Sequence, residues 1–139
     1  MSSQGKLLYT ARTRTTAGRE SGIARSSDGR LDVRLSTPGS ARIGTNPEQL
    51  FAAAWSACFE SAIAHAADKQ GIDLPVPPTI DAEVDLNLDG DGCFIRARLN
   101  VSLPGLEPLA AQALVNEAHR ESAYSKATRG NIEVVINLV

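Results

Sequence analysis

The chain has 139 residues, enough for one ordinary domain and too few for two domains that each bury a core of their own. Hydrophobic residues make up 42% and charged residues 22%, which excludes an intrinsically disordered chain and a fibrous repeat. Fourteen Lys and Arg against sixteen Asp and Glu give a formal net charge of −2, and no segment concentrates basic residues, which argues against a nucleic-acid partner. We therefore expect one domain over residues 1–139.

The sequence shows no signal for export or for a membrane. The start, MSSQGK, is polar and lacks the apolar segment of a secretory signal. The longest apolar run, residues 50–66, is interrupted by Glu60 and is shorter than a membrane span. Two cysteines, Cys58 and Cys93, are too few for a disulfide framework. We expect a soluble, cytoplasmic protein with no membrane partner, in which each cysteine is explained by packing or by reactivity.

The N-terminal third has the pattern of short strands. In residues 7–15 and 30–36, apolar and polar side chains alternate, as they do in half-buried strands. The segments 16–22 and 28–29 contain glycines, which are common in hairpin loops because they adopt positive φ. The pattern predicts a three-stranded meander. Its last strand has these apolar residues on one face: Leu31, Val33 and Leu35.

A long helix is predicted to follow. Asn46 is a good N-cap, Pro47 suits the first helical position, and Gln49 stands three residues after the cap. The helix is apolar on nearly every side before it turns polar at residues 68–70 and stops at Gly71. Such a helix is central and is covered by a sheet or by another chain. Because aromatic residues are only 4% of the chain, we expect a partner surface to complete the core.

The next segment is predicted to be a β-hairpin. Residues 75–78 contain three prolines and form an extended linker. Residues 80–88 and 93–103 alternate in polarity on either side of the Asp-Gly-Asp-Gly turn at 89–92. Two long antiparallel strands joined by a tight turn follow from this pattern.

The last part of the chain predicts one more helix and one more strand. Residues 107–121 have the spacing of an amphipathic helix. A final strand places four apolar side chains on one face: Ile132, Val134, Ile136 and Leu138. Because strands and helices are segregated along the chain, the fold class is α+β rather than a βαβ series.

Cys58 is the first candidate for chemistry. Its ordinary interpretation is a small buried hydrophobe that never ionises, since free cysteine is among the most buried residue types. Its own helix offers no activating group, because Glu60 faces away and His65 lies about 10 Å further along the axis. A thiolate at Cys58 therefore needs a cation from another segment.

Arg19 and Glu48 are the charged candidates. Arg19 lies in a loop between Gly18 and Gly22, and a guanidinium presents several fixed donors without losing its charge. Its ordinary interpretation is a solvated turn residue. Glu48, in the first turn of the long helix, is equally well explained as a favourable charge at the positive end of the helix dipole. Spacing alone does not establish an active site.

Metal and hydrolase chemistry have less support. The four possible soft ligands lack the close paired spacing of zinc sites, so we expect no metal site. No bound cofactor is expected either. A Cys–His hydrolase that uses Cys58 and His119 has no local signature, and His119 instead suits a cap near the C-terminal end of the second helix. The four residues are Cys58, His65, Cys93 and His119.

Several segments resemble one known family. They are AGR at 17–19, GTNPEQLFAA at 44–53, ACF at 57–59, YSKATRGN at 124–131, and, less specifically, VSLPGL at 101–106 and Ala118-His119. On these segments the chain resembles the organic hydroperoxide resistance proteins, the Ohr branch of the OsmC/Ohr superfamily. The 44–53 string is shared more loosely with the whole superfamily, whereas AGR and YSKATRGN point to the Ohr branch. The resemblance covers the chain from about Tyr9 to Val139.

The resemblance implies a fold and a reaction. The fold is an intertwined homodimer in which antiparallel sheets wrap around long central helices. The reaction is that of a thiol peroxidase: a helix cysteine attacks the terminal oxygen of an organic hydroperoxide, releases an alcohol and becomes a sulfenic acid. Cys58 matches the peroxidatic position, Arg19 the arginine that pairs with the thiolate, and Glu48 the glutamate that orients it. A guanidinium beside the sulfur favours the thiolate and stabilises charge on the departing oxygen.

The spacing of Glu48 and Cys58 sets a geometric condition. Ten residues correspond to about 15 Å along a straight helix, so one arginine cannot touch both within that helix. Either the helix is broken after its first turns, or the glutamate is supplied across the dimer.

At one position the chain departs from the family. The resolving cysteine of the Ohr branch lies two residues before the tyrosine of the YS motif, and here that position is Ser122, before Ala123 and Tyr124. The proline that usually follows the cysteine is also absent, which favours natural divergence over an engineered replacement. A serine hydroxyl can hydrogen-bond a sulfenic acid but cannot form a disulfide with it.

Three outcomes stay open. The protein is a one-cysteine peroxidase reduced by an external thiol, in this family a dihydrolipoyl group that can resolve the mixed disulfide with its own second sulfur. Alternatively, Cys93 is the resolving thiol, although nothing places it within the roughly 7 Å that a disulfide needs. The third outcome is a catalytically impaired binder or sensor of apolar ligands.

The first outcome is our hypothesis: Cys58, with Arg19 and Glu48, reduces bulky organic hydroperoxides, including those of fatty acids. An apolar pocket favours them over hydrogen peroxide, because their apolar part contributes binding energy. The partners implied are a second copy of the chain, the hydroperoxide, and a lipoylated protein or small dithiol.

Overall fold

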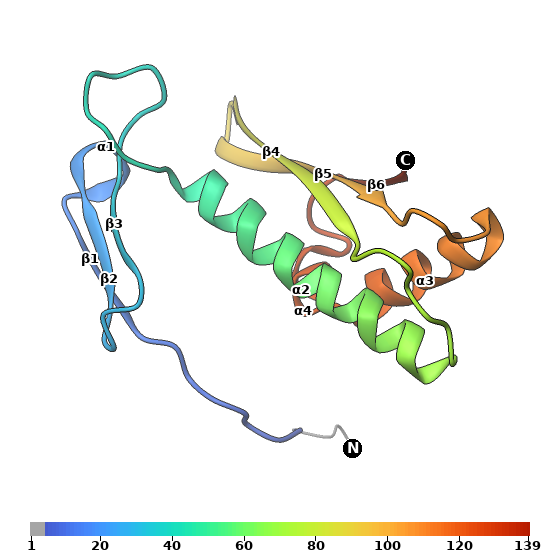
Figure 1. The fold of residues 1–139 in the computed structure, drawn as a ribbon. Coiled ribbons are helices and arrows are strands. Elements are labelled where there is room, and N and C mark those ends of the chain that lie inside the picture. The colour runs from blue at the N-terminus through green and yellow to red at the C-terminus, as the bar shows by residue number, and fades with distance from the viewer. Residues whose placement is uncertain (1–4) are drawn as a thin grey trace. The chain divides into compact units, whose positions relative to one another are not determined.

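The computed structural model describes residues 5–139, and the chain contacts divide into two compact units, Met1–Pro47 and Glu48–Val139. Figure 1 shows the elements of each unit in chain order. The first four residues of the polar start, on which the expectation of no signal segment partly rests, lie outside the described residues. The two units are described in turn.

The N-terminal unit is built on a three-stranded antiparallel sheet. It contains β1 (Thr13–Thr16), β2 (Ile23–Ser26) and β3 (Asp32–Arg34) in the order β1-β2-β3, which confirms the predicted meander. One helical turn, α1 (Gly18–Ser21), stands between β1 and β2 where a hairpin loop was expected. The first strand is shorter than predicted, because β2 offers only four residues to pair with and residues 7–12 are therefore not in a strand.

The second unit begins with a single long helix. α2 (Pro47–Lys69) has 23 residues and starts at the predicted proline. It ends where Gly71 takes a positive φ of 67° and the N–H of Ile72 donates to the carbonyl of Ala67 at 2.9 Å. The predicted end of the helix at Gly71 is therefore confirmed. Because the helix is continuous from Pro47 to Lys69, a break after its first turns is excluded.

The sheet of the second unit has three strands in the order β4-β5-β6. β4 (Thr79–Asp89) and β5 (Gly92–Ser102) form the predicted hairpin, with Asp89 opposite Gly92 at the turn. β6 (Val134–Leu138) pairs with β5 in parallel, so the sheet is mixed: the expected antiparallel pairing holds for β4 and β5 but not for β5 and β6. The parallel pair forms because a helical crossover separates β5 from β6 in the chain.

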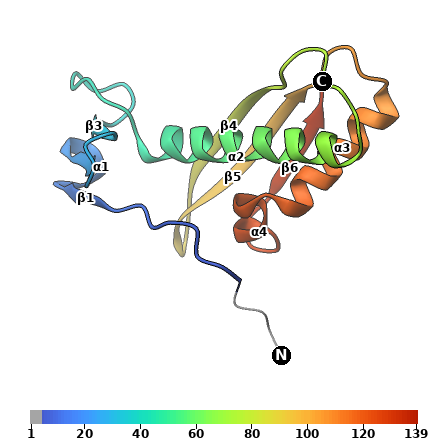
Figure 2. The same ribbon diagram turned by 60° about the horizontal axis from the view of Figure 1, so that its bottom comes forward.

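Two helices make this crossover. α3 (Pro108–Glu121) is the predicted amphipathic helix, and the Glu107 side chain caps it by accepting from the backbone N–H groups of Leu109 and Ala110 at 3.1 Å. α4 (Ala123–Thr128) follows after one residue and was not predicted. In both Figure 1 and Figure 2, α2 and α3 lie next to the β4-β5-β6 sheet.

The core of the second unit lies between these helices and the sheet. Side chains alternate along β5, with Leu99 and Val101 fully buried and Arg98 and Asn100 only partly covered, so one face of the sheet is packed. The largest buried side chains come from three helices and one strand: Trp55, Phe59 and Ile63 of α2, Leu99 and Val101 of β5, Leu114 of α3, and Ser125 of α4.

α2 is only partly covered by this packing. Its buried residues follow one stripe from Trp55 to Ala67, whereas Ala53, Ala57 and Ala64 are exposed in the single chain. α2 extends beyond the apolar run 50–66, and by length and composition it could cross a membrane. Core helices of soluble proteins can have the same length and composition. The prediction that a sheet covers the helix is confirmed for one face.

Candidate active site

A surface depression contains Cys58. Its volume is about 440 Å³, and its two walls are α2 and the junction between α3 and α4. Cys58 and Ser122, which are 64 positions apart in the sequence, therefore lie in one hollow. The lining residues are Ala57, Cys58, Ser61, Ala62 and His65 from α2, and Glu121, Ser122 and Ala123 from the junction.

Cys58 is exposed, so its interpretation as a buried hydrophobe is wrong. The physical reason is the phase of α2. The core-facing side chains of α2 recur every four residues, at Trp55, Phe59 and Ile63. Cys58 falls between these positions and therefore projects from another side of the helix. A sulfur at the surface of a hollow is accessible to a substrate, as a reactive cysteine must be.

His65 and Glu60 of α2 lie as the helical spacing predicts. His65 lines the same depression and is exposed, two turns after Cys58. Glu60 does not line it. Among the described residues, no group of three or more His, Cys, Asp or Glu side chains is placed to hold a metal ion.

Ser122 is held firmly at the opposite wall. Its backbone N–H donates to the carbonyl of Ala118 at 2.8 Å, and its own carbonyl accepts from the N–H of Lys126 at 2.9 Å. The residue is 3% exposed, and its Oγ is buried with no hydrogen-bond partner among residues 5–139. A buried hydroxyl without a partner costs about 1–3 kcal/mol. Asn87 Nδ2 and His119 Nδ1 are likewise buried without a hydrogen-bond partner among the described residues.

α4 is anchored to α2 by side chains of the YSKAT segment. The indole N–H of Trp55 donates to Ser125 Oγ at 3.3 Å, and the rings of Phe51 and Tyr124 meet edge to face at 6.0 Å. This helix was not predicted, because six residues are too few to show a helical period. The available signals were Ser122 at its N-terminus and Gly130, with a φ of 76°, after its end.

His119 does not have the role of a charged cap. It lies near the end of α3 as predicted, but Ser122 is the cap, and the His119 ring packs beside Phe59 at 6.5 Å. Burial, followed by the positive charge of Arg129, lowers the pKa of His119, so the neutral imidazole is favoured. His119 does not line the depression, so the structure does not pair it with Cys58 as a Cys–His hydrolase requires.

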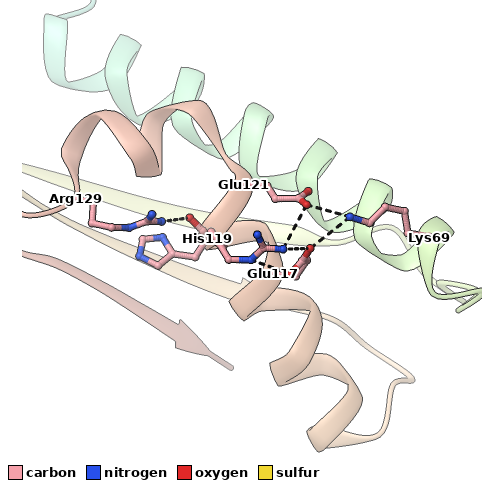
Figure 3. Close-up of polar contacts among 6 residues, drawn as sticks. Lys69, Glu117, His119, Glu121 and Arg129 are labelled. Atoms are coloured by element: carbon pink, nitrogen blue, oxygen red, sulfur yellow. Dashed lines mark hydrogen bonds and ion pairs between the residues drawn. The ribbon is translucent and has the colours of Figure 1, made fainter. Parts of the chain in front are cut away.

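An ion-pair network, shown in Figure 3, connects the C-terminal end of α2 to α3. Lys69 Nζ lies 3.0 Å from Glu121 and 3.4 Å from Glu117, and Arg120 pairs with Glu117 at 2.5 Å. The hydrogen bond that Arg120 donates holds the pKa of Glu117 at about 2. The hydrogen bond that Lys69 donates to Glu121 raises the pKa of Lys69. Since Glu121 lines the depression, the network links its two walls.

Arg19 lies in α1 of the N-terminal unit and is half-buried, not fully solvated as a turn residue would be. The backbone around it is tightly specified. Ala17 and Gly18 have φ values of 64° and 70°, a conformation unfavourable for alanine. At Gly22 a Cβ would collide with the carbonyl oxygens of Thr16 and Gly18, so only glycine fits there.

Glu48 and Cys93 complete the list of predicted residues. Glu48 is half-buried in the first turn of α2, as expected, and the continuous helix keeps it about 15 Å along the axis from Cys58 of the same chain. Cys93 is a free, exposed cysteine opposite Leu88, directly after the hairpin turn, and it does not line the depression.

Comparison with known proteins identifies relatives of the whole chain. The family model described as OsmC-like protein matches residues 19–137, which includes Arg19, Glu48, Cys58 and Ser122. The chain is 44% identical over 142 residues to the organic hydroperoxide resistance protein of Xanthomonas axonopodis pv. citri, and the match covers 99% of each chain.

Solved structures share the fold. The crystal structure of the organic hydroperoxide resistance protein OhrB of Bacillus subtilis matches with a TM-score of 0.89 and 41% identity, over 96% of this chain and 100% of that one. A putative organic hydroperoxide resistance protein of Vibrio cholerae, with captopril bound in one of the active sites, matches with a TM-score of 0.90 and 33% identity, over 98% and 95% of the two chains.

Proposed function

Because the chain belongs to the OsmC-like protein family, in its organic hydroperoxide resistance branch, we propose that it is a thiol-dependent peroxidase acting at Cys58. The observation that carries the proposal is the exposed sulfur of Cys58 in a hollow that also contains position 122. The substrates are organic hydroperoxides, including those of fatty acids, and the products are the corresponding alcohols.

The chemical step uses the Cys58 thiolate as the nucleophile. Its sulfur attacks the terminal oxygen of the hydroperoxide, the O–O bond breaks, and the sulfur keeps that oxygen as a sulfenic acid. The leaving alkoxide takes a proton and departs as the alcohol. Arg19 favours the thiolate and stabilises the developing negative charge, and Glu48 orients Arg19.

The active unit is a homodimer. The continuity of α2 keeps Glu48 far from Cys58 in one chain, so the Glu48 and the Cys58 that share one arginine belong to different copies of the chain. The exposed alanines of α2 support the same assembly, because they leave an apolar helix face uncovered in the single chain. Activity therefore depends on assembly.

The sulfenic acid is reduced by an external thiol. Ser122 cannot form a disulfide, and Cys93 does not line the depression. A dihydrolipoyl group, on a protein or a small molecule, attacks Cys58 with one sulfur and releases it with the other, so no bound cofactor is needed.

Specificity for organic peroxides comes from small apolar side chains in the lining. Ala57, Ala62 and Ala123 offer contacts that an alkyl group can use and that hydrogen peroxide cannot.

The thiol reductants that this cycle needs are maintained in the cytoplasm, which is where we place the protein.

The test is intact-mass analysis after one equivalent of cumene hydroperoxide, with a sulfenic-acid trap present. We expect one trap adduct on Cys58, the same adduct in Cys93→Ser, and none in Cys58→Ser. Peroxide consumption should then be sustained by dihydrolipoamide and more weakly by a monothiol. A wild-type protein that binds the peroxide but stays unmodified would be an apolar-ligand binder or sensor and not an enzyme.

A further inference from the structure

We propose that Ser122 donates a hydrogen bond to the oxygen that Cys58 gains, and that this bond protects the sulfenic acid from a second oxidation. The inference rests on the proposed peroxidase function, and it gives the residue at the resolving position a role that needs no disulfide. Three features of the second unit carry it.

The first feature is position. Cys58 and Ser122 line the same depression from opposite walls, α2 and the α3–α4 junction. The ion pairs of Lys69 with Glu117 and Glu121 link these two elements, so the walls are tied together close to the site. Cys58 and Ser122 therefore belong to one hollow of the folded unit.

The second feature is the unpaired hydroxyl. Two neighbouring buried hydroxyls are used: Ser125 Oγ accepts from Trp55, and Thr128 Oγ1 donates to the carbonyl of Tyr124 at 2.8 Å. Ser122 Oγ is equally buried and has no partner among the described residues. Its donor capacity is thus unsatisfied while Cys58 is reduced, at a cost that a new acceptor would remove.

The third feature is the fixed backbone of Ser122. The residue ends α3 and begins α4, and its N–H and carbonyl are both engaged, with Ala118 and Lys126. These bonds hold the backbone of Ser122 at the wall of the depression, where an acceptor that enters the hollow can meet its hydroxyl.

Oxidation of Cys58 supplies that acceptor. The added oxygen extends the cysteine by one atom into the depression, and both a sulfenic acid and a sulfenate accept a hydrogen bond. A donated bond withdraws electron density from the sulfur, so attack by the sulfur on a second hydroperoxide is slowed. That attack would transfer another oxygen to give sulfinic acid and a second alcohol. The sulfur stays open to attack by an external thiolate, which forms a mixed disulfide with Cys58 and releases water. The second sulfur of the dithiol then displaces the Cys58 thiol and leaves the reductant as a disulfide.

Such protection matters more in this chain than in one with a resolving cysteine. A neighbouring thiol consumes the sulfenic acid quickly by disulfide formation, whereas Ser122 cannot. The intermediate then persists until an external thiol arrives, and it stays exposed to more peroxide meanwhile. A donor at position 122 compensates for that longer lifetime.

The experiment compares the full-length wild type with Ser122→Ala and with the matched control Ser61→Ala, an exposed serine of the same depression. Cumene hydroperoxide is added without thiol, and quenched mass spectrometry follows gain of the first and of the second oxygen on Cys58. The first rate is measured in each protein as the reference for the second. The second rate should rise about three- to tenfold in Ser122→Ala only, as the loss of one hydrogen bond implies.

The outcomes separate this inference from the proposed function. If the wild type never gains a first oxygen, the peroxidase function fails and the role of Ser122 fails with it. If the first oxygen is gained but Ser122→Ala overoxidises at the wild-type rate, only the role of Ser122 is overturned. An equal increase in Ser61→Ala would also overturn it, because a solvated hydroxyl would then be equally effective.

A second variant keeps the inference testable if the alanine variant folds poorly. Ser122→Cys should form a disulfide with Cys58 after one equivalent of peroxide, seen as loss of two hydrogens in mass and of both free thiols. An oxidised Ser122→Cys protein without that bridge would place position 122 out of reach of the Cys58 oxygen and would overturn the inference.

Discussion

The two units of the chain differ in charge and in packing. Met1–Pro47 has eight Lys and Arg against three Asp and Glu, and of its described apolar residues only Ala24 and Leu35 are buried. Glu48–Val139 has six against thirteen, and it contains the hydrophobic core around α2 and β5. The proposed nucleophile thus lies on a unit with its own core, whereas the proposed activating cation lies on a unit almost without one.

The sheets of the two units show the same contrast. In the N-terminal sheet Arg14 lies directly opposite Arg25, a like-charged pair that disfavours pairing, although Asp32 lies 3.0 Å from Arg25 and offsets part of the repulsion. In the second sheet Arg98 lies opposite Glu83, and its guanidinium also meets Asp85 at 2.8 Å. We therefore expect substitutions in the second unit to change stability and substitutions at Arg19 to change catalysis.

The largest effect is expected for Arg19→Ala. Removing a charged donor that stabilises the developing charge should lower kcat/KM for cumene hydroperoxide about 10²- to 10³-fold, with little change in the unfolding temperature. Arg19→Lys, which keeps the charge but not the planar fork of donors, should fall in between. Steady-state assays with dihydrolipoamide measure both. A variant with half of the wild-type activity would remove Arg19 from the mechanism.

Leu99→Ala should have the largest effect on stability. Leu99 is fully buried in the core of the second unit, and truncation of such a leucine lowers the free energy of unfolding by about 2–5 kcal/mol. Leu88→Ala is the matched control, because Leu88 of the same hairpin is 78% exposed. Urea unfolding measures both. Equal effects would mean that the two leucines are equally buried in solution.

The ion-pair network should make stability depend on pH. Because the folded-state pKa of Glu117 is about 2, below the ordinary value of 4.5, its contribution is complete above pH 4.5 and is lost as the pH falls toward 2. Glu117→Gln should remove this part of the acid dependence in thermal unfolding curves. Glu133→Gln, at an exposed ion pair outside the network, is the control. An unchanged acid slope in Glu117→Gln would contradict the role of Arg120.

The smallest effect is expected for Cys93→Ser. Cys93 is exposed beside the hairpin turn and does not line the depression, so its removal should leave turnover with dihydrolipoamide unchanged. The assay is the one used for Arg19→Ala, with Cys58→Ser as the inactive reference. Loss of turnover would instead identify Cys93 as the resolving thiol.

The elements with strong local signals could be predicted from the sequence. Pro47 started α2 and the turn at 89–92 joined β4 to β5, because caps and turns depend on a few neighbouring residues. The parallel pairing of β6 and the short α4 were not predicted. The first depends on a strand far away in the chain, and the second is too short to have a period.

The sequence by itself determined which chemistry is available: a cysteine in the long helix, and at position 122 a serine that cannot form a disulfide. Only the tertiary structure decided how these residues meet. The phase of α2 is set by the packing of Trp55, Phe59 and Ile63 against the sheet, and this phase exposes Cys58. Burial of an unpaired hydroxyl across the same hollow depends on contacts between distant segments, which local sequence patterns do not encode.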